Sequence, residues 1–187
     1  MSTIYIKNMV CTRCIMAVEF ELEKVGIKSS SIKLGEVELE KMPTKDQINK
    51  LTQAIEVLGF EIIDDKKTRL IEQIKSIIIQ QVHYQETELK VNLSQVISAQ
   101  LNHDYNHLST LFSEVEGTTI EKYYIAQKIE KVKELLVYDE LSLSEIADTL
   151  NYSSVAYLSN QFKKVTGLSP SHFKQIRADK RKPLDQV

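Results

Sequence analysis

Polar and hydrophobic residues follow strand-like and helix-like patterns in turn over the first third of the chain. Residues 3–7 alternate as in a strand, and residues 15–25 then carry apolar side chains at helical spacing. A capping box formed by Thr44 and Gln47 opens a second helix. Further extended pieces are expected at residues 30–34, 36–40 and 60–63. The predicted order, β-α-β-β-α-β, is that of a ferredoxin-like sandwich.

The rest of the chain shows helical spacing and contains an internal repeat. An amphipathic helix is predicted over residues 69–84. Residues 101–112 are repeated as residues 150–162 with one inserted residue, and the offset between the copies is then fifty. The matching pairs are Leu108 with Leu158, Ser109 with Ser159, Phe112 with Phe162, Val115 with Val165 and Gly117 with Gly167. Such self-similarity indicates one supersecondary unit that is used twice.

Each copy is predicted to form two short helices joined by a tight turn, which is the helix-turn-helix motif. In the second copy, Asn151 and Tyr152 turn the chain. The expected N-caps are Asp104, Ser142 with Glu145 as a capping box, Ser153, and Thr118 ahead of a joining helix over residues 120–137. The expected buried faces are Leu108, Leu111, Phe112 and Val115 in the first copy, and Val155, Leu158, Phe162 and Val165 in the second.

These patterns give an α+β fold class with two kinds of domain. Residues 1–64 form the ferredoxin-like domain, and residues 65–90 are the linker and first helix. Residues 91–178 form an all-α double helix-turn-helix domain, and residues 179–187 form a basic tail.

Composition and charge favour a helix-rich cytoplasmic protein with one basic end. The chain is 42% hydrophobic and 27% charged, and apolar runs such as residues 77–79 are too short to cross a membrane. The net charge of −2 is unevenly spread. Residues 149–187 hold seven lysines and arginines against two aspartates, a net charge of +5, whereas residues 1–65 carry −3. The basic end is where we expect a phosphate backbone to be met.

The C-terminal half resembles the AraC/XylS family of bacterial transcription regulators. The resemblance covers about residues 69–178 and rests on residues 143–147 (LSEIA) and 162–173 (FKKVTGLSPSHF), in which Ser169 and Pro170 open a last helix. It implies a DNA-binding domain of about seven helices, in which two helix-turn-helix units are joined by a long helix.

The residues expected to touch double-stranded DNA are those left outside the buried faces of the two second helices. In the first unit they are Tyr105, Asn106, His107, Ser109 and Thr110. In the second unit they are Ser153, Ser154, Ala156, Tyr157, Asn160, Lys163 and Lys164. Short polar side chains can reach base edges or phosphates, and lysines suit phosphates.

The chain's two cysteines, Cys11 and Cys14, lie between the first strand and the first predicted helix. With Met9 they form a Met-x-Cys-x-x-Cys motif that is similar to the loop of heavy-metal-associated domains. That resemblance implies two thiolates that bind a soft ion such as copper(I), zinc, cadmium or mercury, with Met9 as a core anchor. Soft thiolates select soft ions, and we expect the following helix N-terminus to lower the thiol pKa.

Other interpretations of the cysteine pair remain open. The domain could serve dimerisation with incidental cysteines, or the pair could be a thiol redox switch. Because two thiolates leave most ions short of ligands, a linear copper(I) site or completion by a second subunit fits best.

The leading hypothesis is a transcription regulator that responds to a soft metal ion bound by its N-terminal domain. The competing class, a metal-binding carrier or chaperone, leaves the duplicated helical half without a role. An enzyme is disfavoured because no triad, paired-carboxylate or phosphate-binding glycine motif is present, and no organic cofactor is expected.

Overall fold

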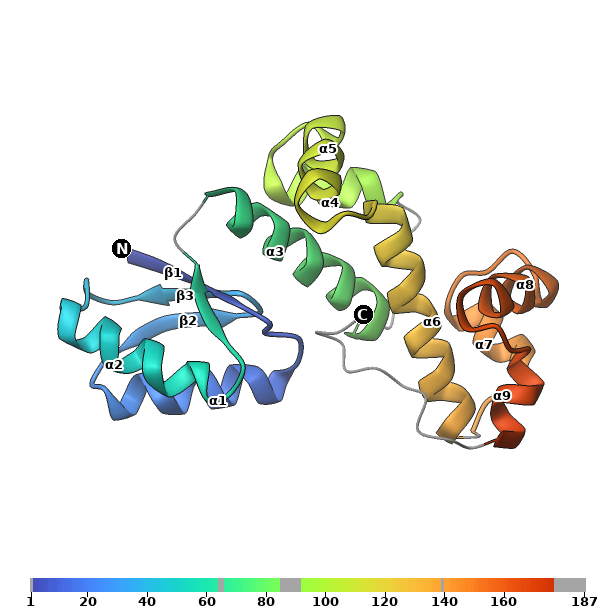
Figure 1. Cartoon of the computed structure of the whole chain (residues 1–187), viewed down its shortest axis with the longest axis horizontal. Helices are drawn as coiled ribbons and strands as arrows, with labels where there is room; N and C mark the ends of the chain where they lie inside the picture. Colours follow the sequence, from blue (N-terminus) through green and yellow to red (C-terminus); the bar gives the residue numbers. More distant parts are fainter. Residues whose placement is uncertain (1, 64–65, 85–91, 139, 177–187) are drawn as a thin grey trace. The chain divides into compact units, whose positions relative to one another are not determined.

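The computed structural model describes residues 2–63, 66–84, 92–138 and 140–176 (Figure 1). The predicted basic tail (179–187) and most of the predicted linker (85–90) lie outside these residues. The contacts divide the chain into two compact units, one formed within residues 1–77 and 94–111 and the other within residues 78–93 and 112–187. The predicted domain boundaries, at residues 1–64, 65–90, 91–178 and 179–187, remain a prediction.

The N-terminal region has the predicted β-α-β-β-α-β order. Its elements are β1 (Ser2–Lys7), α1 (Thr12–Lys24), β2 (Ser29–Lys33), β3 (Glu36–Leu39), α2 (Lys45–Glu56) and β4 (Glu61–Ile63). The strands form one antiparallel sheet in the order β2-β3-β1-β4. The central strands are therefore β3 and β1, and the loop that leads from β1 to α1 ends at Cys11.

One face of this sheet packs on α1 and α2. Apolar side chains from both helices and from β1 and β3 meet there and are fully or almost fully buried: Ile6, Val18, Leu22, Val37, Leu39, Leu51 and Ile55. Thr44 and Gln47 form the predicted capping box at the start of α2. The spacing of Ile48, Leu51, Ile55 and Leu58 predicts that all four line the buried side of this helix, but Leu58 does not: α2 ends at Glu56, and Leu58 is 47% exposed in the following turn.

The other face of the sheet is covered by α3 (Lys66–Ile79), as Figure 1 shows. The Arg69 guanidinium lies 4.8 Å from the centroid of the Tyr5 ring, and a Cβ atom at Gly35 would lie 3.2 Å from the hydroxyl of Ser76. The helix begins three residues before its predicted start. It continues as a five-residue π-helix, Gln80–Tyr84.

The remaining helices confirm the all-α organisation. They are α4 (Leu93–Leu101), α5 (Tyr105–Glu116), α6 (Ile120–Tyr138), α7 (Leu143–Thr149), α8 (Val155–Thr166) and α9 (Pro170–Ile176). With α3, the described residues from Lys66 onward hold seven α-helices, the number that the family resemblance implied. The joining helix α6 is capped by Thr119, whose Oγ1 accepts from the N–H of Lys122, and not by the predicted Thr118.

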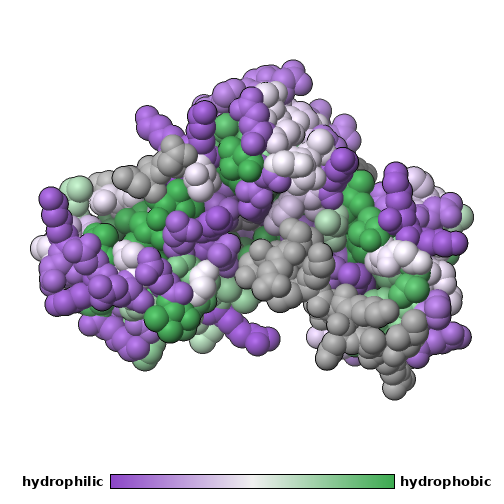
Figure 2. All heavy atoms as spheres, in the orientation of Figure 1, coloured by the Kyte–Doolittle hydropathy of each residue, from purple (hydrophilic) through white to green (hydrophobic). Residues whose placement is uncertain are grey.

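The surface is polar on most of the face shown in Figure 2, with apolar residues gathered in smaller areas. In the part of the chain that the structure describes, every helix is too short or too polar to span a membrane.

Candidate nucleic-acid interface

The second helix-turn-helix consists of α7, a short turn and α8. Ser142 and Glu145 close the predicted capping box at the start of α7, where the Ser142 N–H donates to Glu145 Oε2 at 2.7 Å. Asn151 adopts a left-handed conformation, with φ 53°, at the turn. The cap of α8 is Ser154, whose hydroxyl accepts from the N–H of Tyr157, and not the predicted Ser153. The helix therefore starts one residue later than expected.

The first unit repeats these features at the equivalent positions. Asn102 has the same left-handed φ of 53°, and Asp104 caps α5 by accepting from the N–H groups of Asn106 and His107. The buried aromatic pairs also repeat: the ring centroids are 5.8 Å apart for Phe112 and Tyr123, and 5.5 Å apart for Phe162 and Phe173. The duplication read from the sequence is thus a duplication in structure.

The second-unit residues that the sequence proposed for DNA contact lie on α8 or, for Ser153 and Ser154, directly before its first residue. These side chains are exposed: Ser153, Ser154, Ala156, Tyr157, Asn160, Lys163 and Lys164. Leu158 and Phe162 are fully buried in a cluster with Ile129, Val132 and Phe173. The prediction that Val155 and Val165 are buried is wrong: they are 37% and 48% exposed, because they lie at the two ends of the helix, beyond this cluster.

The outward face of α5 is formed by the first-unit candidates. Asn106, His107 and Thr110 are exposed, whereas Tyr105 and Ser109 are half-buried. Leu108, Leu111 and Phe112 are buried as predicted. Val115 is not: it is 48% exposed near the C-terminal end of the helix, as its repeat partner Val165 is in α8.

The two faces differ in charge. The last turn of α8 carries Lys163 and Lys164, both exposed, whereas the twelve residues of α5 contain two glutamates and no lysine or arginine. The lysines of α8 can therefore form ion pairs with DNA phosphates, whereas α5 can contact DNA only through neutral amide, hydroxyl and imidazole groups.

Comparison with known proteins supports the presence of helix-turn-helix units in this part of the chain. Residues 97–176 match the family model of a helix-turn-helix domain. The C-terminal part of this chain is therefore similar to a helix-turn-helix domain. The xylose operon regulatory protein of Escherichia coli K12 is 27% identical over 129 residues, which cover 68% of this chain and 33% of that protein. The HTH-type transcriptional regulator YfiF of Bacillus subtilis is 31% identical over 104 residues, 53% of this chain and 33% of that protein. This chain thus spans about a third of the length of these curated relatives.

The fold is also found among solved structures. The C-terminal domain of AraT, a response regulator from Geobacillus stearothermophilus, superimposes with a TM-score of 0.51 at 24% identity, covering 63% of this chain and 95% of that domain. At this identity the likeness shows the helical fold.

The two cysteines lie together at the start of α1. Cys11 is the N-cap residue and Cys14 lies in the first turn, so only Cys11 is outside the helix, contrary to the prediction that the loop holds both. Both thiols are free and partly buried, and their Sγ atoms are 3.3 Å apart. Met9 is 3% exposed, which confirms that its side chain is in the core. Among the described residues, no group of three or more histidine, cysteine, aspartate or glutamate side chains could hold a metal ion.

The expected lowering of the thiol pKa does not hold for Cys14. Burial raises the pKa of this thiol, and this effect outweighs the opposing hydrogen bond from the Val10 backbone. Desolvation of this thiol therefore outweighs the stabilisation that a helix N-terminus gives to a thiolate.

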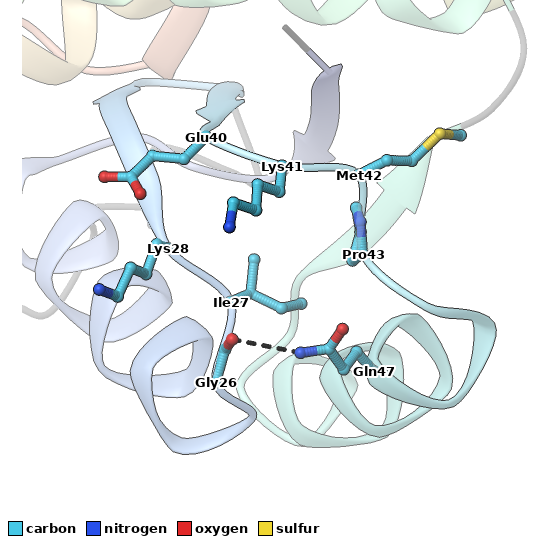
Figure 3. A pocket seen from close by; sticks show the side chains of 8 residues that line it. All are labelled: Gly26, Ile27, Lys28, Glu40, Lys41, Met42, Pro43 and Gln47. Carbon is cyan, nitrogen blue, oxygen red and sulfur yellow. Dashed lines mark hydrogen bonds between the residues drawn. The ribbon is translucent and has the colours of Figure 1, made fainter.

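A separate hollow of about 350 Å³ lies at the other end of α1, where Gly26 and Ile27 face the start of α2 (Figure 3). Gln47 connects the two segments, because its amide donates to the carbonyls of Val25 and Gly26, each at 3.2 Å. Lys28, Glu40 and Lys41 also line it. The sequence did not single out this hollow, and the length of α1, about 20 Å, separates it from the cysteines.

Proposed function

We propose that this protein is a sequence-specific DNA-binding transcription regulator that reads duplex DNA with α5 and α8. The observation that carries the proposal is the outward face of α8, which is polar and exposed. The opposite side of the helix is buried against residues of α6 such as Ile129 and Val132. A helix held in this way on a helix-turn-helix can enter the major groove as a rigid body.

The two helices have different tasks in this proposal. Asn160 and Tyr157 lie on the exposed face of α8, where asparagine can pair with the edge of adenine. Lys163 and Lys164 contact phosphates and position the helix. On α5, Asn106 and Thr110 read bases without a cationic neighbour on the same helix.

The test is selection of DNA fragments from a random-sequence pool by the purified protein, followed by measurement of the dissociation constant over a series of salt concentrations. A regulator of this kind enriches a common sequence, and its affinity falls as a power of the salt concentration because phosphate contacts release counterions. Failure to enrich any sequence, with equal affinity for selected and random fragments, would overturn the proposal.

We propose further that Cys11 and Cys14 bind a soft metal ion, which makes the N-terminal domain a sensor. The short distance between the sulfurs supports this role. Two Zn–S bonds of about 2.3 Å at a tetrahedral angle separate the sulfurs by about 3.8 Å, so a small side-chain rotation from 3.3 Å suffices. A linear copper(I) ion needs a wider separation.

Two thiolates supply only half of the ligands of a tetrahedral zinc ion. The number of ions bound per chain therefore indicates which ion is bound and whether two chains share it. One ion per chain favours copper(I) held by Cys11 and Cys14 alone, whereas one ion per two chains favours a homodimer that shares the site. In either case binding of the ion would change DNA affinity only if the DNA-bound and free states hold it differently.

The metal is tested by anaerobic titration with copper(I) and with zinc in competition with a chromophoric chelator. Wild type is compared with the Cys11→Ser, Cys14→Ser double variant, and Met9→Leu serves as the matched control because it keeps the core anchor but removes the thioether. Loss of the high-affinity site in the cysteine variant alone is expected. Equal binding by all three proteins would rule out the thiol site, and metal binding without any DNA selectivity would favour the carrier.

A further inference from the structure

Tyr152, in the turn between α7 and α8, is buried and contacted from three sides. Its hydroxyl donates to Oε1 of Gln161 on α8 at 2.7 Å, and its ring centroid lies 6.1 Å from that of Tyr157, also on α8. On a third side the Lys128 ammonium nitrogen of α6 lies 3.8 Å from the ring centroid. This distance is well within the range of a cation–π interaction. Tyr152 therefore links the joining helix α6 to the helix proposed to read DNA.

Lys128 is held in place by its own surroundings. Its side chain is 8% exposed, and its ammonium group also lies 5.5 Å from the ring centroid of Tyr124, one turn earlier on α6. Tyrosine rings lie around this ammonium group: Tyr124 on α6 and Tyr152 in the turn lie near it, and Tyr157 of α8 lies beside Tyr152.

The first helix-turn-helix has an equivalent ring pair, His103 and His107 with centroids 6.1 Å apart, but its described residues show no buried ring under a cation at this position. With Asn102 matched to Asn151, the residue equivalent to Tyr152 is His103, which is exposed. The first unit nevertheless has the same turn conformation and the same buried aromatic pair. A buried aromatic residue with a cation over it is therefore not required for a helix-turn-helix of this sequence type to fold.

We propose that Tyr152, under the ammonium group of Lys128, is a positioning residue that fixes the orientation of α8 for sequence-specific DNA reading. This inference rests on the proposed DNA-binding function. The ring and the hydroxyl act together: the cation holds the ring against α6, and the hydrogen bond to Gln161 ties α8 to the ring. Tyr157, the exposed neighbour on α8, is then presented in one orientation.

The arrangement makes DNA specificity dependent on pH. Burial lowers the pKa of Lys128 to about 8. As the pH rises through this value the ammonium group becomes a neutral amine and loses its attraction to the ring. Base contacts that need a fixed helix should weaken, whereas phosphate contacts made by the exposed lysines tolerate a looser one.

The experiment measures dissociation constants for a selected fragment and for random DNA, at fixed salt, from pH 6.5 to 9.5. Wild type is compared with Lys128→Arg, which stays charged throughout, and with Lys128→Met, which is uncharged at every pH. For wild type, the ratio of the two constants is expected to fall about fivefold between pH 7 and pH 9.5, equivalent to about 1 kcal/mol. Lys128→Arg should show no such fall, and Lys128→Met should have the low ratio at all pH values.

Tyr152→Phe keeps the ring but removes the bond to Gln161, and it should lower the ratio at every pH while leaving random binding unchanged. A wild-type ratio that does not change with pH would overturn the proposal, and so would parallel profiles for wild type and Lys128→Arg. If Lys128→Met fails to fold, the other two profiles still decide. Failure of the wild type to prefer any sequence at pH 7 would instead refute the proposed function itself.

Discussion

Nε2 of His83 lies 3.0 Å from Oε1 of Gln127, and this contact joins the π-helical segment to the middle of α6. Gln127 is fully buried and also donates through its amide nitrogen to the hydroxyl of Tyr123 at 3.0 Å. Since the amide nitrogen is engaged as a donor, Oε1 is the acceptor and His83 donates from Nε2. The glutamine thus satisfies two polar groups inside the helical unit.

We expect Gln127→Leu to destabilise the protein by about 1–3 kcal/mol, because it removes both hydrogen bonds in a buried setting. Urea unfolding monitored by circular dichroism should show a lower midpoint with an unchanged slope. Gln53→Leu, at an exposed glutamine of α2, is the control and should change stability by no more than about 0.5 kcal/mol. Equal midpoints for the two variants would contradict this prediction.

The Ser142–Glu145 box should contribute measurably to stability through the start of α7. Ser142→Ala is expected to lower the free energy of unfolding by about 1 kcal/mol, since it leaves a helix N–H without its cap. Ser144→Ala, at an exposed serine within α7, removes no cap and should be close to neutral. A loss of similar size in both variants would contradict this prediction, because alanine has the higher helix propensity and only the loss of a cap is expected to destabilise the helix.

Glu145 gives this box a pH dependence of defined sign. Hydrogen bonds from the side chain and backbone of Ser142 hold the pKa of Glu145 below its usual value. A carboxylate with a lowered pKa in the folded state stabilises above its unfolded pKa, and the contribution is lost as the pH falls through the folded one. The stability difference between wild type and Glu145→Gln should therefore be constant near neutral pH and shrink in acid, below about pH 4. A stability difference between wild type and Glu145→Gln that stays constant down to pH 3 would contradict this prediction.

Features set by local sequence were predictable, and features set by packing were not. The capping boxes and the order of strands and helices along the chain follow from spacing within a few residues, and the repeat follows from comparing residues 101–112 with residues 150–162. Asn8 is also understandable locally: it adopts a left-handed φ of 69°, which asparagine tolerates. The start of α1 was misplaced because its N-cap, Cys11, makes no side-chain cap hydrogen bond and gives no signal.

The exposure of Val155 and Val165 was missed because helical spacing does not show where a packing partner ends. The contact of Lys128 with Tyr152 was likewise out of reach, since the two residues are far apart in sequence and meet only through the packing of α6 on the turn. The sequence suggested the exposed candidates on α8 and the buried Leu158 and Phe162, but not the support that Tyr152 and Lys128 give to that helix.

Lys128 should make the protein more stable as the pH rises from 8 towards 10.5. Its pKa falls from 10.5 to about 8 on folding because the ammonium group is buried. Between these values the unfolded chain binds more protons, so unfolding becomes less favourable with increasing pH. From this lowered pKa, burying the charged form of Lys128 reduces the free energy of unfolding below pH 8 by at most about 3 kcal/mol.

The check is to measure unfolding of wild type and Lys128→Met at pH 7 and at pH 9.5. Lys128→Met should be the more stable protein at pH 7, and its advantage should shrink at pH 9.5. Burial raises the pKa of Tyr124 and Tyr152, which lowers stability above about pH 10, but both variants share that effect and it cancels in the difference. An advantage that does not depend on pH would contradict the prediction. A variant that is more stable and yet less selective for DNA would separate the positioning role of Lys128 from any role in folding.

Asn160 and Lys164 should contribute to DNA binding in distinguishable ways, although both are exposed on α8. Asn160→Ala removes a side chain suited to a base edge, so it should weaken binding to a selected fragment by about tenfold and leave random DNA nearly unaffected. Lys164→Gln removes a phosphate contact, so it should weaken both by the same factor and reduce the salt slope by about 1. Lys50→Gln, at an exposed lysine of α2 paired with Asp46, is the matched control for loss of one positive charge. If Asn160→Ala weakens both DNAs equally, base reading by α8 is wrong at this position. If Lys50→Gln reduces the slope as much as Lys164→Gln, the effect is one of net charge and α8 makes no phosphate contact there.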